Sequence, residues 1–200
     1  SDLTLSDNVF NIDKTAPAAL NPDNVTDIFV KSASVVKGRS DGKYYVTSAN
    51  SGLKSAEELK TLVKDDESGV SKVEVQKDGL ALQDSLSEGE NNLDVVAYDN
   101  VGNKKTVYSL VVVVGNDPIT GDYKMTLKSP KETVQAYNNK LYYKLGENGA
   151  GRPVFDVEVP VPQSGITNIK VSDTGKITSV DYSTGKVTVE NVNDGKLTLS

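Results

Sequence analysis

The alternation of apolar and polar residues is clearest over residues 91–114, NNLDVVAYDNVGNKKTVYSLVVVV. Apolar side chains recur at every second position on both sides of a polar turn at residues 99–103, which is the period of a β-strand with one buried face. Gly102 supplies the positive φ that a tight turn needs. The pattern predicts a β-hairpin whose buried faces carry Leu93, Val95, Ala97, Tyr108, Leu110 and Val112.

Shorter strand-like runs precede this hairpin. They lie at residues 3–12, 28–36, 43–47 and 73–76, and the last of them runs into Asp78-Gly79, a two-residue turn that fits strand twist. The period changes once, at residues 55–63, where Ser55 and Glu58 have the spacing of a capping box and the apolar residues have helical spacing. We expect a β-sandwich of about seven short strands with one short helical insertion.

Residues 115–118, GNDP, are the strongest candidate domain boundary. The sequence after this boundary again has the pattern of β-strands. Apolar and polar residues alternate at 123–127, and further strands are expected at 141–145 and 155–161. Prolines 153, 160 and 162 place at least part of that last strand on a sheet edge. Three Gly-Lys-x-Thr copies, spaced by ten, predict a meander of hairpins. The predicted fold is all-β, with two tandem β-sandwich domains at residues 1–116 and 117–200.

Composition narrows the possible partners. The 200 residues carry a net charge of −6 without a basic stripe, which argues against nucleic acid and an anionic membrane surface. No apolar run approaches the roughly 18 residues of a membrane span, so membrane insertion is not expected. The chain has no Cys, so its cores must stabilise it without disulfides. We expect the chain to be a piece of a longer protein, because it begins and ends abruptly in sequence with a β-strand pattern.

Catalytic motifs are incomplete. The chain has no His, which removes the commonest general base and transition-metal ligand. Residues 38–42 match G-x-S-x-G, 51–54 match S-x-x-K and 6–8 match S-D-N, but their partners are missing or their order is reversed. The glycine-rich residues 146–151 lack the G-K-[ST] end of a phosphate loop. We therefore predict no enzyme, no catalytic or cofactor-binding residue and no cofactor.

Acidic residues at turns leave one alternative open. Asp65, Asp66 and Asp99 are of the type that supplies oxygen ligands to Ca²⁺. The preferred interpretation is that they close turns by hydrogen bonding to nearby backbone, because no D-x-D-x-D-G loop exists. No metal site is therefore predicted. The Tyr pairs at 44–45 and 142–143 place one ring of each outward, where it can cover a sheet or contact sugar.

Three segments carry a family likeness. NIDKTAP at 11–17, DDESGV at 65–70 and GENNLDVVAYDNVGNKK at 89–105 together resemble the bacterial immunoglobulin-like domains of secreted and cell-surface proteins. The resemblance covers about residues 12–114 and implies a seven-strand sandwich, from which the helix at 55–63 departs. ITSVDYSTGKVTV at 177–189 is similar to the ending of another bacterial immunoglobulin-like group. Some Gram-positive domains of this class carry a Lys–Asn crosslink, which the sequence does not place.

This resemblance sets the functional expectation. It implies tandem immunoglobulin-like domains that act as a non-catalytic stalk, spacer or adhesin module of a secreted or surface-anchored bacterial protein. The location would be extracellular, and the partners would be neighbouring domains of a longer chain together with host protein or glycan. The alternative is a pair of accessory domains of a secreted hydrolase, with carbohydrate as a ligand.

Overall fold

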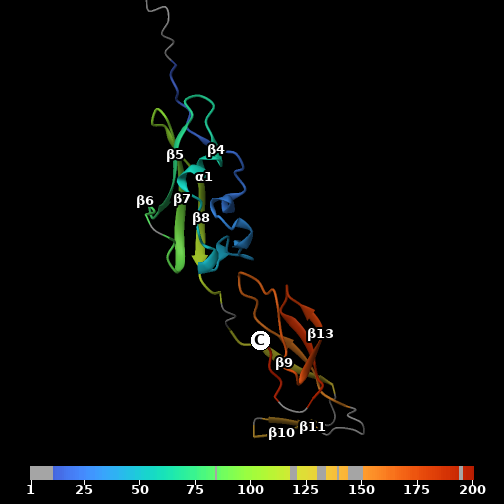
Figure 1. The fold of residues 1–200 in the computed structure, drawn as a ribbon. Helices are drawn as coiled ribbons and strands as arrows, with labels where there is room; N and C mark the ends of the chain where they lie inside the picture. The colour runs from blue at the N-terminus through green and yellow to red at the C-terminus, as the bar shows by residue number, and fades with distance from the viewer. Residues whose placement is uncertain are drawn as a thin grey trace, which may run out of the picture. The chain divides into compact units, whose positions relative to one another are not determined.

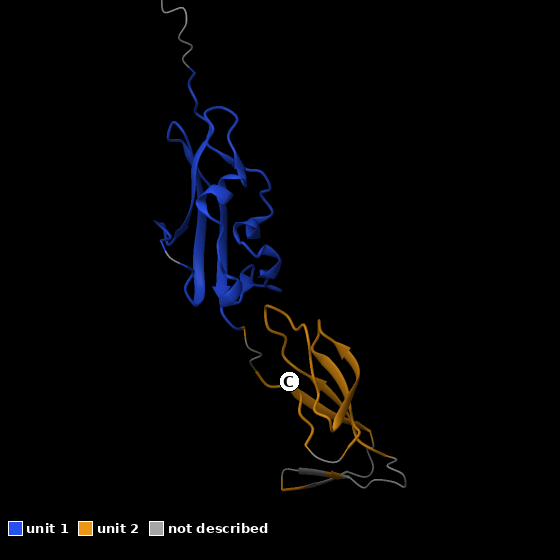
Figure 2. Cartoon of the chain, viewed as in Figure 1, with its two compact units in different colours: residues 1–116 blue, residues 117–200 orange. Residues whose placement is uncertain are grey.

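The computed structural model describes residues 11–83, 85–117, 121–129, 134–138, 140–143, 151–193 and 196–200. The predicted strand at 3–12 therefore lies almost wholly outside the described residues. The chain divides into two compact units, residues 1–116 (unit 1) and 117–200 (unit 2), shown in Figure 2. Both are mostly β, so the all-β prediction is confirmed. In the described ranges, no helix is long and apolar enough to span a membrane.

Unit 1 is built on one six-stranded sheet, in which the predicted hairpin is confirmed (Figure 1). The strand order is β2 (Val36–Lys37), β3 (Tyr44–Val46), β8 (Lys104–Val114), β7 (Gly89–Asp99), β5 (Val70–Lys77) and β6 (Leu80–Ala81). The two hairpin strands, β7 and β8, are each eleven residues long and pair with Leu93 opposite Leu110. A register shift between Val95 and Val96 interrupts the pairing. Every residue predicted to face inward on this hairpin is buried.

Short helices and one small ladder cover the inner face of this sheet (Figure 1). The elements are β1 (Ala18–Ala19), η1 (Val25–Ile28), η2 (Ser32–Ser34), η3 (Ser48–Asn50), α1 (Ala56–Lys60) and β4 (Val63–Lys64). The predicted strand at 28–36 is wrong, because only its last residue, Val36, belongs to a strand. Ile28 ends η1, Ser32–Ser34 form η2, and Phe29 makes a single isolated bridge with Leu53. Two apolar residues of this run are nevertheless core residues: Ile28 and Phe29 are completely buried. Fully burying such a side chain is worth about 1.5–3 kcal/mol.

The capping box is confirmed at the start of α1. The Glu58 backbone N–H donates to Ser55 Oγ at 3.3 Å, and the Ser55 N–H donates to Glu58 Oε2 at 2.9 Å. The helix is shorter than predicted because Thr61 is its C-cap and Val63 already belongs to β4, which pairs with β1. The Asp78-Gly79 turn is also confirmed, with positive φ at both residues, as a type I′ hairpin turn requires.

Unit 2 contains a four-stranded antiparallel sheet, with strand order β13 (Gly175–Asp181), β14 (Lys186–Asn191), β12 (Val154–Glu158) and β9 (Lys124–Ser129). A second pair joins β10 (Val134–Tyr137) to β11 (Lys140–Tyr143). The first Gly-Lys-x-Thr copy begins β13, and the second copy begins one residue before β14. The two strands pair with each other, so these copies form the predicted hairpin. In the described part of the third copy, residues 196–198 form no strand.

The predicted sheet-edge position of residues 155–161 is wrong. β12 lies inside the sheet, between β14 and β9. The prolines do not interrupt its ladder because the strand starts just after Pro153 and ends before Pro160. Pro153 instead accepts a hydrogen bond from the Asn191 N–H through its carbonyl oxygen, at 2.8 Å. Among the described residues of unit 2, the buried apolar side chains include Val157, Val187 and Val189.

Candidate functional site

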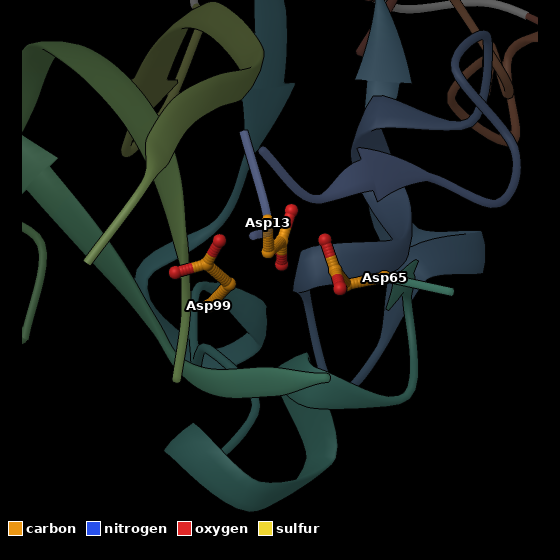
Figure 3. Close-up of side chains that lie close together, drawn as sticks. All are labelled: Asp13, Asp65 and Asp99. Atoms are coloured by element: carbon orange, nitrogen blue, oxygen red, sulfur yellow. The ribbon is translucent and has the colours of Figure 1, made fainter. Parts of the chain in front are cut away.

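Three aspartates from distant parts of unit 1 lie close together (Figure 3). Asp13 belongs to the N-terminal arm, residues 11–17; Asp65 follows β4; Asp99 ends β7. One carboxylate oxygen of each lies within 4.8 Å of those of the other two. The sequence indicates Asp65 and Asp99 as candidate calcium ligands, and the structure brings these two together. It does not bring Asp66 to them: Asp66 is exposed and pairs with Lys64 at 3.1 Å.

Asp99 is held by the turn that it closes. Its side chain is buried, and Oδ1 accepts hydrogen bonds from the N–H groups of Val101, Gly102 and Asn103 at 2.9, 2.6 and 2.7 Å. The Asn103 side-chain amide donates to Oδ2 at 2.6 Å. Burial raises the pKa of Asp99, but the side-chain and backbone donors outweigh it and lower the pKa overall. Asp99 therefore stays ionised inside the fold.

Asp65 accepts hydrogen bonds through only one of its two carboxylate oxygens. Its Oδ1 accepts hydrogen bonds from the N–H groups of Glu67 at 3.1 Å and Gly69 at 2.9 Å, which closes the turn between β4 and β5. Its Oδ2 is buried and has no hydrogen-bond partner among the described residues. A buried carboxylate oxygen without a partner is costly, so this atom is the least satisfied of the cluster.

Asp13 ties the N-terminal arm to both other segments. Its Oδ1 accepts the Thr15 N–H at 2.8 Å, its Oδ2 accepts the Ser68 N–H at 3.0 Å, and its backbone oxygen accepts the Asn103 amide at 3.2 Å. The pKa of Asp13 is lowered, first by the nearby Ser68 hydroxyl and then by the Thr15 N–H. The pKa of Glu67 is raised, because its carboxylate lies beside that of Asp13.

The cluster offers hard oxygen ligands without nitrogen or sulfur, since the chain has no His or Cys. Such a set suits Ca²⁺, which takes six to eight oxygens at roughly 2.3–2.6 Å, and does not suit zinc. Three aspartates supply at most part of such a shell, and the turns by themselves account for the hydrogen bonds of Asp99. Calorimetric titration with CaCl₂, with Asp65→Asn as the control, measures whether the oxygens bind Ca²⁺ besides closing turns.

Sequence reasoning missed Asp13 as a member of the cluster. Residues 13, 65 and 99 are too far apart for any local pattern to connect them. A local signal did exist, because an Asp side chain often accepts the backbone N–H of the residue two positions later, as Asp13 accepts the Thr15 N–H. The family resemblance placed all three segments in one domain, but it gave no contact between them.

The residues of the incomplete catalytic motifs have structural roles where the structure describes them. In the G-x-S-x-G match, Asp41 Oδ1 accepts the Lys43 N–H at 2.9 Å and closes a turn. In the S-x-x-K match, Ser51 is buried and donates to the Ser48 carbonyl oxygen at 2.9 Å. The S-D-N match lies outside the described residues, as does all but Gly151 of the glycine-rich segment. In the Tyr pairs, Tyr44 and Tyr45 are both half-buried, whereas Tyr142 is exposed.

Unit 2 has a polar groove of about 530 Å³ on the sheet formed by β9, β12, β13 and β14. Hydroxyl, carboxylate and ammonium groups line it, including Lys124, Thr126, Asp156, Glu158, Asp181 and Lys186. The Thr188 hydroxyl donates to Asp156 at 2.9 Å. No aromatic ring is among its lining residues in the described part of unit 2, so the stacking surface that sugars favour is missing there.

Comparison with known proteins adds no family. No protein-family model matches the chain, and no curated protein or solved structure was found to be similar to it. The resemblance to bacterial immunoglobulin-like domains therefore stays a prediction from residues 11–17, 65–70 and 89–105.

Proposed function

We propose that this chain is a non-catalytic structural module, a pair of immunoglobulin-like domains that serves as a stalk, spacer or adhesin segment of a secreted or surface-anchored bacterial protein. One observation carries the proposal: the chain enters and leaves unit 1 at opposite ends of β8. The N-terminal arm is bonded to Asn103, next to the start of β8, and the chain leaves through Gly115, just after its end.

This arrangement suits a segment that carries tension. A pull on the chain beyond Gly115, against a fixed N-terminal arm, draws β8 along its own axis. β8 pairs with β7 along most of its length and with β3 in parallel through residues 112–114, and Gly115 N–H donates to the Val46 carbonyl oxygen at 3.0 Å. Strand hydrogen bonds run perpendicular to the strand, so this pull loads many of them together.

Single-molecule force measurement on the full chain tests the proposal. The chain has no Cys, so paired cysteines can serve as handles. Handles at Asn11→Cys and Asn116→Cys pull β8 along its axis. Handles at Glu88→Cys and Asn116→Cys peel β8 from β7 one bond at a time and are the matched control. We expect the axial pair to require clearly more force. Equal forces would show that unit 1 is not built to carry tension.

The alternative, accessory domains of a secreted hydrolase, has one supporting observation in the polar groove on unit 2. Its carboxylates and hydroxyls are groups that hydrogen-bond to sugars. Binding of the full chain to a glycan array, abolished by Thr126→Ala with Asp156→Ala but not by Asp23→Ala in unit 1, would support this function. A catalytic domain in the flanking parent sequence would support it further, and an anchoring segment there would favour the stalk.

A further inference from the structure

The turn between β5 and β6 combines a reactive dipeptide with an unengaged carboxylate. Asp78 and Gly79 are exposed at its tip and have φ values of 52° and 80°. The Asp78 carboxylate makes no hydrogen bond or ion pair with any residue that the structure describes. Gly79 has open space around its Cα, because a Cβ built there would meet nothing within 4 Å. Both reacting groups are therefore accessible.

We propose that Asp78 is a site of spontaneous isoaspartate formation. The Gly79 backbone nitrogen attacks Asp78 Cγ, the N–Cγ bond forms, and the carboxyl hydroxyl leaves with the amide proton as water. The product is a five-membered succinimide. Water then adds to one of its two carbonyls: opening on the side-chain carbonyl restores aspartate, and opening on the main-chain carbonyl gives isoaspartate. The sequence of steps consumes and returns one water and needs no oxidant or reductant.

The local fold lets the turn open for this reaction. β6 pairs with β5 only through Ala81 with Gln76 and Leu80 with Lys77, followed by one bond from Leu82 N–H to the Val75 carbonyl oxygen at 2.8 Å. Leu80 is 75% exposed, so little apolar surface becomes newly exposed to water when it separates from β5. Short edge hairpins of this kind open locally without unfolding the core. Opening frees the dihedral angles that ring closure needs.

Asp41-Gly42 is the same dipeptide in a protected setting. Asp41 Oδ1 accepts the Lys43 N–H at 2.9 Å, and Oδ2 accepts the Tyr45 hydroxyl. The Tyr45 hydroxyl, followed by the Lys43 N–H, lowers the pKa of Asp41. Ring closure expels hydroxyl from the protonated acid most readily, so a carboxylate that is held and kept ionised reacts slowly. Asp41 is therefore an internal reference for Asp78.

The test ages the full chain in ¹⁸O-labelled water at neutral pH and maps it by mass spectrometry. Passage through the succinimide replaces one carboxyl oxygen by ¹⁸O, and isoaspartate blocks cleavage by Asp-N protease at that residue. We expect both signals to accumulate several-fold faster at residue 78 than at residue 41. In chain unfolded with urea, the two rates should become similar. Equal rates in the folded chain, or no heavy oxygen at residue 78, would overturn the proposal.

A variant tests the cause of the difference. Tyr45→Phe removes the hydroxyl donor to Asp41, so the rate at residue 41 should rise while the rate at residue 78 stays the same. Isoaspartate adds one atom to the main chain, which the two-residue turn cannot accommodate. Hydrogen exchange at residues 80–82 should therefore become faster in the aged chain. Unchanged exchange in a chain that contains isoaspartate would contradict this structural consequence.

Discussion

At the scale of single residues, Asp99 shows how one buried carboxylate can organise a turn. It receives three backbone N–H groups and one side-chain amide, so removing it takes away the acceptor that holds all four donors in this turn. The same Asn103 amide also reaches the Asp13 carbonyl oxygen. Asp99 thus supports both the hairpin and, through Asn103, the attachment of the N-terminal arm.

Asp99→Ala should lower the melting temperature of unit 1 by roughly 5 °C or more, because hydrogen bonds to a charged group are among the strong ones. Asp23→Ala is the matched control, since Asp23 is exposed and in the same unit. Calorimetry on the full chain measures both changes. A loss no larger than that of the control would contradict the structural role of Asp99.

Glu67→Gln should stabilise unit 1 in a pH-dependent way. The neighbouring Asp13 carboxylate raises the pKa of Glu67, so the folded state holds this proton more tightly than the unfolded state. Stability from that proton is present at low pH and is lost as pH rises through the folded pKa. The variant should therefore melt higher than the parent at neutral pH, with the gain vanishing near about pH 4. An equal gain at both pH values would refute the carboxylate pair.

At the scale of elements, local signals were sufficient where the contacts are local. The β7–β8 hairpin and the Ser55–Glu58 capping box follow from residues close in sequence. The prediction at 28–36 was wrong because a short apolar segment has no decisive period. Here 3₁₀ turns take the place of the strand, and only Ile28 and Phe29 of the run are fully buried. The meeting of Asp13, Asp65 and Asp99 depends on chain folding over long separations, which no sequence pattern records.

The short helices that cover the sheet of unit 1 should contribute as much to the stability of the unit as the sheet does. Phe29 is completely buried next to η1, so Phe29→Ala should destabilise unit 1 by about 3–5 kcal/mol. Val30, its neighbour in sequence, is 62% exposed, and Val30→Ala should change the free energy of unfolding by less than about 0.5 kcal/mol. Urea denaturation gives both values. Similar losses for the two variants would mean that this layer is not packed as described.

At the scale of the whole molecule, each unit has its own buried apolar residues. Unit 1 is centred on residues of β7 and β8 with Phe29, and unit 2 on β12 and β14. Each unit therefore has the means to form a cooperative folding unit of its own.

Calorimetry of the full chain should show two unfolding transitions. Phe29→Ala should lower one of them and Val187→Ala, which removes a side chain buried in unit 2, should lower the other. A single transition that both variants shift equally would show instead that the two units unfold together.

The opposite placement of the arm and Gly115 along β8 has a consequence for evolution. Eleven residues of strand cover roughly 35 Å at about 3.3 Å per residue. If unit 1 serves the proposed stalk function, each further copy of it in series would add one more strand of this length between the ends of the chain and would need no change in the hydrophobic interior. Under that proposal, selection could change the reach of the stalk through the number of copies alone.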